Sequence, residues 1–385
     1  MRASTPKSAL LLALLLALSG CGGEDKPQPP GDRADAGTVA APSAPLCPFA
    51  GDGVCDEPAS CALGTDSADC DAACAAPDPP ARLYGACTFR ARGLPDHEAV
   101  DPDLAKRGSH GSGGLYGWSW GSILARNPGG SSLPPVRRYY MAYVPDTYDP
   151  ARPAPLMYYL AGFGVSMYGN AGWTDQNQLA ERNGVIVVYV QQHYRNMGKH
   201  GWMMGWHVYL QAFRGTDPND PAQWSDNPDL DFLVKLTERL KGLYNIDRTR
   251  VWTTGHSRGG GMSVILPFLR PDVFAGSCGQ AAFSHVNKFE DFIRAYKGRR
   301  FPAVLVHGTM DDNVQPSEYH ATVKAYRDAG WKTLADLQKE GRDPSEETLR
   351  DYFIPAQGHR WQPDLNQEWF DFLYARPIPL NEVAP

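Results

Sequence analysis

One serine of this chain is flanked by glycines at a point where a strand gives way to a helix. The apolar run 251–254 leads directly into Gly255-His256-Ser257-Arg258-Gly259, a G-x-S-x-G sequence with two further glycines behind it. This pattern is typical of a nucleophile elbow, a strained turn that exposes a serine hydroxyl at the edge of a sheet. Glycine is required on both sides because neighbouring chain leaves no room for side chains. Ser257 is therefore the predicted nucleophile of an acyl-transfer reaction.

The same pattern occurs a second time, at Gly117-Trp118-Ser119-Trp120-Gly121. This copy follows a Gly/Ser-rich stretch with no strand ahead of it, and tryptophan on each side of the serine is bulky for a tight turn. We therefore expect an aromatic loop around Ser119 and not a second nucleophile.

An elbow serine needs an acid and then a histidine in later loops of the chain. Asp311 and His359 each follow an apolar run, in that order. Because parallel strands end at one edge of a sheet, both side chains can reach Ser257 despite their separation in sequence. His359 would take the hydroxyl proton and Asp311 would orient its imidazole. Asp312 is the alternative acid; otherwise it is a loop carboxylate or turn cap.

The tetrahedral intermediate of such a reaction needs two hydrogen-bond donors. The backbone N–H of Arg258 is expected to be one, because it directly follows the nucleophile. The other should come from the loop 160–164 after an earlier strand, and we favour the N–H of Phe163.

Aromatic and Met residues gather in the stretch 201–207 without the spacing of one helix face. Trp202 and Trp206, together with His256 of the elbow, are candidates to line a substrate groove. The alternative is a buried aromatic cluster under a long insertion, with His256 packed inside the protein.

Strands and helices alternate along the chain from about residue 136. This rhythm predicts a mostly parallel sheet with helices on both faces, which is the α/β class and, with the elbow, the α/β-hydrolase fold. Strands are expected at 137–144 (antiparallel), 156–160, 185–190, 251–254, 273–278, 301–306 and 352–354, and helices at 230–243, 317–329 and 369–374.

Residues 136–375 resemble the polyhydroxybutyrate depolymerase and feruloyl esterase family of secreted α/β hydrolases. The resemblance rests on the elbow, on His307-Gly308-Thr309-Met310-Asp311 and on Gly358-His359-Arg360-Trp361. It implies an esterase that acts on a polyester or on acyl groups of plant polysaccharide, through a Ser-His-Asp triad and an acyl-enzyme. One departure is Leu160-Ala161-Gly162, where the family usually has Leu-His-Gly. The oxyanion donor is a backbone group, so catalysis should survive this change.

The first residues predict export. Basic residues precede the apolar run 9–18, which is too short to span a bilayer, and Leu18-Ser19-Gly20-Cys21 resembles a bacterial lipobox. We expect a signal peptide at 1–20, lipidation of Cys21, and a flexible tether at 21–46 that holds the enzyme at a membrane of the cell envelope. The alternative is plain secretion. A net charge of −6 gives no reason to expect nucleic acid as a partner.

Four cysteines, Cys47, Cys55, Cys61 and Cys70, crowd into one short segment, with Cys74 and Cys87 just beyond them. In an exported protein this suggests a small disulfide-held module, which we place at residues 47–74. This segment resembles a Notch repeat, and the resemblance implies a structural calcium ion, with solvated acids and no metal as the alternative. The ligands would be Asp52, Asp56, Asp66 and Asp69. A connecting segment at 75–135 and a catalytic domain at 136–377 would follow. Cys278 is expected to be an inert core thiol.

The leading interpretation is a serine esterase that needs no metal or organic cofactor for catalysis. A serine peptidase on the same fold is the nearest alternative, because a triad does not distinguish esters from amides. A cell-surface binding protein with a degenerate hydrolase scaffold is the alternative from another class.

Overall fold

The computed structural model describes residues 118–127, 133–165, 167, 174–196, 202–207, 217–282 and 289–384. The predicted signal peptide, tether and cysteine-rich module lie outside these residues, as do Cys21 and the four aspartates of the predicted calcium site. Among the described residues, no helix combines the length and the apolar character that a membrane span requires.

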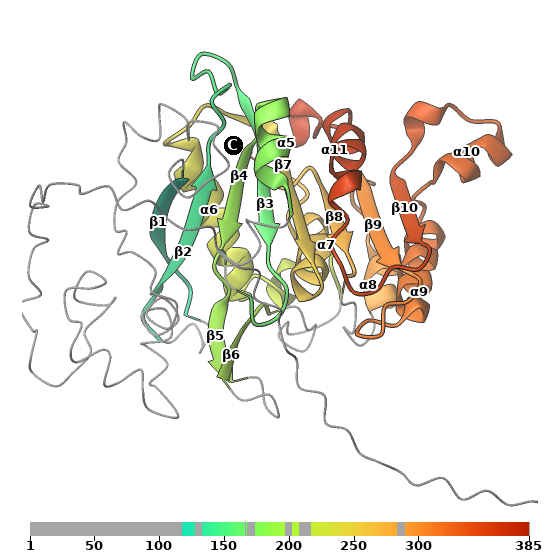
Figure 1. The fold of residues 1–385 in the computed structure, drawn as a ribbon, viewed down its shortest axis with the longest axis horizontal. Helices are drawn as coiled ribbons and strands as arrows, with labels where there is room; N and C mark the ends of the chain where they lie inside the picture. The colour runs from blue at the N-terminus through green and yellow to red at the C-terminus, as the bar shows by residue number, and fades with distance from the viewer. Residues whose placement is uncertain are drawn as a thin grey trace, which may run out of the picture. The chain divides into compact units, whose positions relative to one another are not determined.

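Eight strands form the main sheet, in the order β1-β2-β4-β3-β7-β8-β9-β10 (Figure 1). Strand β2 runs antiparallel to β1 and β4, and the remaining neighbours pair in parallel. The strands are β1 Trp118–Ala125, β2 Val136–Tyr143, β3 Ala154–Leu160, β4 Ile186–Val190, β7 Ile246–His256, β8 Gly276–Gln280, β9 Ala303–Gly308 and β10 Leu349–Ile354. The mostly parallel sheet and the antiparallel second strand match the prediction.

Alternation along the central strands divides the core into two clusters, one on each face of the sheet. In β3, Leu156 and Tyr158 belong to one cluster and Met157 and Tyr159 to the other. The first cluster is filled by residues of the helices α6 (Pro228–Lys241), α7 (Arg258–Leu269), α8 (Phe289–Ala295) and α9 (Pro316–Asp328). The second is filled by residues of α5 (Gln176–Asn183) and α11 (Asn366–Tyr374). Both faces of these strands are covered, which is why the strands are continuous apolar runs in the sequence.

The helices of the described residues are α5 Gln176–Asn183, α6 Pro228–Lys241, α7 Arg258–Leu269, α8 Phe289–Ala295, α9 Pro316–Asp328, α10 Leu334–Glu340 and α11 Asn366–Tyr374. Short 3-10 turns lie at Pro221–Gln223, Pro344–Glu346, Pro363–Leu365 and Leu380–Glu382. The three helices expected from the sequence correspond to α6, α9 and α11.

The sheet extends beyond the limits expected for the catalytic domain. Strand β1, placed by the sequence in the connecting segment, pairs with β2 along its whole length. Ser119 therefore lies in an edge strand, and the expectation of an aromatic loop is wrong; it is not at a strand-to-helix turn either. At the other end, the N–H of Ala384 donates to the carbonyl of Asp272, so the chain beyond residue 377 remains hydrogen-bonded to the domain.

A two-stranded antiparallel ribbon, β5 His193–Asn196 and β6 Trp202–Gly205, follows β4 directly. Figure 1 shows it extending past the edge at which β4 ends. The N–H of Gly164, in the loop after β3, donates to the carbonyl of Met204 in β6 at 3.0 Å. The ribbon therefore braces the loop in which the second oxyanion donor is expected.

Candidate active site

Ser257 occupies the turn between the end of β7 at His256 and the start of α7 at Arg258. Its backbone has φ 56° and ψ −121°, a conformation that costs a non-glycine residue about 1–3 kcal/mol. Two backbone hydrogen bonds stabilise this strained conformation. The Ser257 N–H donates to the carbonyl of Gln280 at 2.9 Å, and the N–H of Gly261 donates to the Ser257 carbonyl at 2.9 Å. The predicted elbow geometry is present.

Two glycines of the motif allow the elbow to press against the end of β3. A Cβ on Gly259 would lie 2.0 Å from the carbonyl oxygen of Leu160 and 2.4 Å from that of Ala161. A Cβ on Gly255 would lie 2.6 Å from the carbonyl oxygens of both Gly259 and Leu160. No side chain fits at either position, so the motif brings the serine beside the loop that follows β3.

Asp311 and His359, from the loops after β9 and β10, meet as predicted. Nδ1 of His359 lies 3.0 Å from Oδ1 and 2.8 Å from Oδ2 of Asp311. Oδ1 also accepts the N–H groups of Asn313 and Val314, at 3.0 and 2.9 Å. Asp311 is 2% exposed, whereas the alternative acid Asp312 is exposed to solvent. The partner of His359 is therefore Asp311.

A close approach of two loops allows this meeting. A Cβ on Gly308 would lie 2.2 Å from the carbonyl oxygen of Gln357, so only glycine lets the chain after β9 touch the chain before His359. The N–H of Met310 donates to the same Gln357 carbonyl at 2.8 Å. The acid loop and the histidine loop thus form one unit.

The imidazole of His359 lies beside the elbow. Its ring centroid is 4.7 Å from that of His256, and its side chain is 16% exposed. His256 itself is 8% exposed, so its ring is packed inside the protein, as the alternative expected. Burial, together with the neighbouring His359, lowers the pKa of His256 to about 3, which keeps its ring neutral.

His307 is a member of the acid loop that sequence reasoning gave no role. Its Nε2 donates to the carbonyl of Val314 at 2.9 Å and lies 3.5 Å from Oδ2 of Asp311. Burial lowers the pKa of His307, so the ring is neutral. It packs between Asp311 and Val314 and so links the two ends of this loop. Its position at the end of a strand, four residues before the acid, was the only signal available.

The loop after β3 lies directly against the nucleophile. A Cβ on Gly162 would be 3.5 Å from Cβ of Ser257 and 3.5 Å from Nδ1 of His256. The guanidinium of Arg258 lies over the ring of Phe163, with Cζ 4.4 Å from the ring centroid. The two residues predicted to supply the oxyanion N–H groups are therefore in contact.

Trp206 supports this loop from inside the protein. It is fully buried, and its indole Nε1 donates to the carbonyl of Ala161 at 2.9 Å. It cannot line a substrate groove, so that prediction is wrong, and the alternative of a buried aromatic is right for this residue. An irregular aromatic run has no period that would show which side chains face inward. The side chain of Trp202 lies outside the described residues.

A buried charge cluster anchors the segment that carries Trp206. Oδ2 of Asp229 accepts the backbone N–H of His207 at 2.6 Å and its Nδ1–H at 2.8 Å, and Oδ1 accepts NH2 of Arg138 at 2.8 Å. Burial alone would raise the pKa of Asp229, but the charges of His207 and Arg138 outweigh it and hold the pKa far below its usual value. The cluster joins β2, α6 and the chain just after β6.

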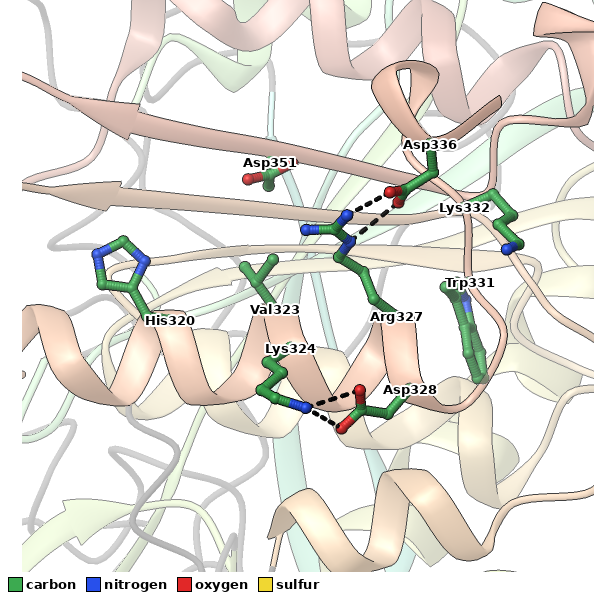
Figure 2. Close-up of a pocket in the computed structure, with 9 residues that line it drawn as sticks. All are labelled: His320, Val323, Lys324, Arg327, Asp328, Trp331, Lys332, Asp336 and Asp351. Atoms are coloured by element: carbon green, nitrogen blue, oxygen red, sulfur yellow. Dashed lines mark hydrogen bonds and ion pairs between the residues drawn. The ribbon is translucent and has the colours of Figure 1, made fainter. Parts of the chain in front are cut away.

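Across the residues that the structure describes, no three His, Cys, Asp or Glu side chains gather as metal ligands would. A cavity of about 560 Å³ lies elsewhere, over α9, α10 and β10 (Figure 2). Figure 2 shows two ion pairs at this cavity, Arg327 with Asp336 and Lys324 with Asp328. Its lining includes none of the predicted site residues.

Comparisons with known proteins identify the family of this chain. Residues 131–338 match the family described as "Putative esterase". Acetylxylan esterase A from Aspergillus awamori is 21% identical over 56% of this chain and 78% of its own length. The solved structure of the acetyl xylan esterase from this organism has a TM-score of 0.49 at 17% identity, covering 66% of this chain and 99% of that one.

A solved structure from Bacteroides ovatus, assigned as a dipeptidyl aminopeptidase IV, has a TM-score of 0.46 at 18% identity and covers 67% of this chain. This chain spans 36% of that protein's length. With TM-scores below 0.5, the likenesses to these two structures support no conclusion about function. The family match covers more than half of the chain and includes the elbow. The chain, with its α/β-hydrolase fold, therefore belongs to this family of esterases and is a serine ester hydrolase.

Proposed function

We propose that this esterase works through Ser257, His359 and Asp311. The observation that carries the proposal is the His359–Asp311 pair, 2.8 Å apart, with the His359 ring 4.7 Å from that of the elbow residue His256. A histidine so oriented has Nδ1 occupied by the acid, which leaves Nε2 to act on the adjacent serine.

In the first half of the reaction, Nε2 of His359 takes the proton of the Ser257 hydroxyl while Oγ bonds to the carbonyl carbon of the ester. Asp311 stabilises the imidazolium that forms. The N–H groups of Phe163 and Arg258 bind the oxyanion of the tetrahedral intermediate. His359 then gives its proton to the leaving alcohol, and a water molecule hydrolyses the acyl-enzyme by the same steps.

The substrate class that we favour is an acyl group, acetyl or feruloyl, esterified to a polysaccharide. Its support is the relative named acetylxylan esterase A and the resemblance of the triad motifs to feruloyl esterases. A polyester of the hydroxyalkanoate type and a peptide amide are the competing substrates.

A substrate panel on the wild type and Ser257→Ala tests both levels of the proposal. It contains p-nitrophenyl acetate, methyl ferulate, acetylated xylan, short-chain polyhydroxyalkanoate and peptide amides. We expect hydrolysis of the first three and loss of at least about 10⁴-fold in kcat for the variant. Esterase activity retained by Ser257→Ala would refute the assignment of Ser257 as the nucleophile. Turnover of the polyester or of amides alone would refute the substrate class.

We further propose that the enzyme acts outside the cytoplasm, either secreted or tethered to a membrane through a lipid on Cys21. The support is the lipobox-like sequence at the end of the apolar run. Mass spectrometry of the mature N-terminus tests it; an unprocessed Met1 would refute export.

The cysteine-rich module is proposed to hold a structural calcium ion through Asp52, Asp56, Asp66 and Asp69, without a role in catalysis. Calorimetric titration of the full chain with calcium, before and after the change Asp66→Asn, tests this site. Equal binding by both proteins, or no binding at millimolar calcium, would refute it.

A further inference from the structure

The loop that follows β3 presents two successive peptide groups to the interior of the protein, and each has its carbonyl held by a side chain from the segment after β4. Trp206 donates to the carbonyl of Ala161. Gln192, which is 3% exposed, donates from Nε2 to the carbonyl of Gly162 at 2.5 Å and to that of Val165 at 2.7 Å. Gln192 has so far no place in the proposed reaction.

The peptide group that Gln192 holds joins Gly162 to Phe163. A trans peptide is planar, and its C=O and N–H point in opposite directions. A donor that fixes the Gly162 carbonyl therefore also fixes the direction of the Phe163 N–H. The N–H of Val165 donates to the same carbonyl at 3.2 Å and closes a turn, so removal of Gln192 takes away the shorter of these two described bonds to the carbonyl.

The orientation of the Gln192 amide is determined by its partners. Both are backbone carbonyl oxygens, which only accept hydrogen bonds, so the nitrogen must face them. Hydrogen bonds on one side of a peptide group also polarise it, which strengthens the donor on the other side. The amide thus both aims the Phe163 N–H and makes it a better donor.

We propose that Gln192 is the positioning residue of the oxyanion hole, through its bond to the peptide between Gly162 and Phe163. This inference rests on the proposed function, in which the Phe163 N–H binds the oxyanion. It also accounts for Ala161, where the resembled family usually has histidine: the loop is held by Gln192 and Trp206 from the following segment.

The chain offers a matched control in the neighbouring glutamine. Gln191 is 4% exposed, as buried as Gln192, and its Nε2 donates to Sδ of Met204 and to the carbonyl of Gln192. Its Oε1 accepts the N–H of Met167 at 3.2 Å, so its described side-chain hydrogen bonds go to Met204, Gln192 and Met167 and not to the peptide of Phe163. Changing either glutamine to methionine keeps the size of the side chain and removes one buried amide. The two variants therefore differ only in which of two adjacent amides is lost.

The experiment compares the wild type, Gln192→Met and Gln191→Met on p-nitrophenyl acetate, with active sites counted by an organophosphate. Deleting a whole oxyanion donor costs about 10²–10³-fold in kcat. Gln192→Met misaligns one, so we expect a fall in kcat of about 10–100-fold with KM nearly unchanged. Affinity for a trifluoromethyl ketone, whose serine adduct carries the oxyanion, should fall by a similar factor. Gln191→Met should keep both values within about threefold.

A purely structural role of Gln192 would lower the fraction of active sites and leave kcat per site and inhibitor affinity unchanged, and this result would overturn the inference. Equal losses in both methionine variants would overturn it too. If Gln192→Met does not fold, Gln192→Glu keeps the shape and replaces the donor with an acceptor, and wild-type kcat in that variant would be the contrary result. Ser257→Ala separates the levels: activity retained there refutes the proposed function itself.

Discussion

The contact between Gly259 and the end of β3 supports a sharp prediction about Gly259→Ala. Its Cβ would lie 2.0 Å from the carbonyl oxygen of Leu160, whereas ordinary contact begins at 3.4 Å, so the two must separate by about 1.4 Å. The obstacle is backbone, which cannot rotate away as a side chain would. We therefore expect the upper end of the usual cost of overpacking, about 3 kcal/mol in the free energy of unfolding.

The same displacement moves the loop that carries the Phe163 N–H. A misplacement of about 1 Å at a reacting centre costs about 100-fold in rate. We expect kcat/KM on p-nitrophenyl acetate to fall at least about 100-fold in the Gly259→Ala protein that remains folded, as measured after counting active sites. Urea unfolding gives the stability change.

Gly260→Ala is the matched control for this prediction. Its Cβ would lie 3.0 Å from the carbonyl oxygens of Gln280 and Gly255, so a shift of a few tenths of an ångström suffices, and neither atom belongs to the loop after β3. Both changes raise helix propensity equally. We expect a loss of about 1 kcal/mol or less and kcat/KM within about fivefold of wild type. If Gly259→Ala matched this control in stability and rate, the steric reasoning would be wrong.

Three further predictions concern buried groups. Asp229→Asn removes the counter-charge of buried Arg138 and should lower the free energy of unfolding, measured in urea, by about 3–5 kcal/mol. Because the folded pKa of Asp229 is depressed, its stabilisation is present above about pH 4 and is lost as the pH falls further. A variant as stable as wild type at pH 7 would contradict this. The pKa of His256 is about 3 in the folded protein and about 6.5 in the unfolded chain, so a falling pH protonates the unfolded state first. The free energy of unfolding of wild type should therefore fall by about 2 kcal/mol between pH 7 and pH 5, and that of His256→Asn should fall by less. Parallel pH profiles of the two proteins would exclude the effect. Burial raises the pKa of the Cys278 thiol, so maleimide should label this residue only after unfolding, as peptide mass spectrometry can check, and labelling of the native protein would show an accessible thiol.

The order of the chemistry-bearing residues was predictable because it follows from the parallel sheet. Each of Ser257, Asp311 and His359 follows an apolar run, and parallel strands bring their carboxyl ends to one edge. That rule needs only the strand rhythm and the chain order, both of which are visible in the sequence. At that level Asp311 is the preferred acid and Asp312 its alternative, and only the structure shows that Asp311 is the one that contacts His359.

Other parts of the molecule could not be predicted, because they depend on partners distant in sequence. The first half of strand β1 consists of Trp, Ser and Gly, which suggested a loop, and the strand is defined by its pairing with β2. Trp206 was expected at a groove, yet it is buried under Ala161. The ribbon of β5 and β6 has too few residues for a periodic signal.

The sequence by itself determined the proposed reaction centre: a G-x-S-x-G turn whose glycines have no room for side chains, and an acid and a histidine at later strand ends. Only the tertiary structure decided what holds that centre in place. Gln192, Trp206 and His307 act through one or two hydrogen bonds to backbone carbonyls of other segments. Any residue with a donor of the right reach could do the same, so no local pattern marks them, and their roles follow only from which carbonyl lies within about 3 Å.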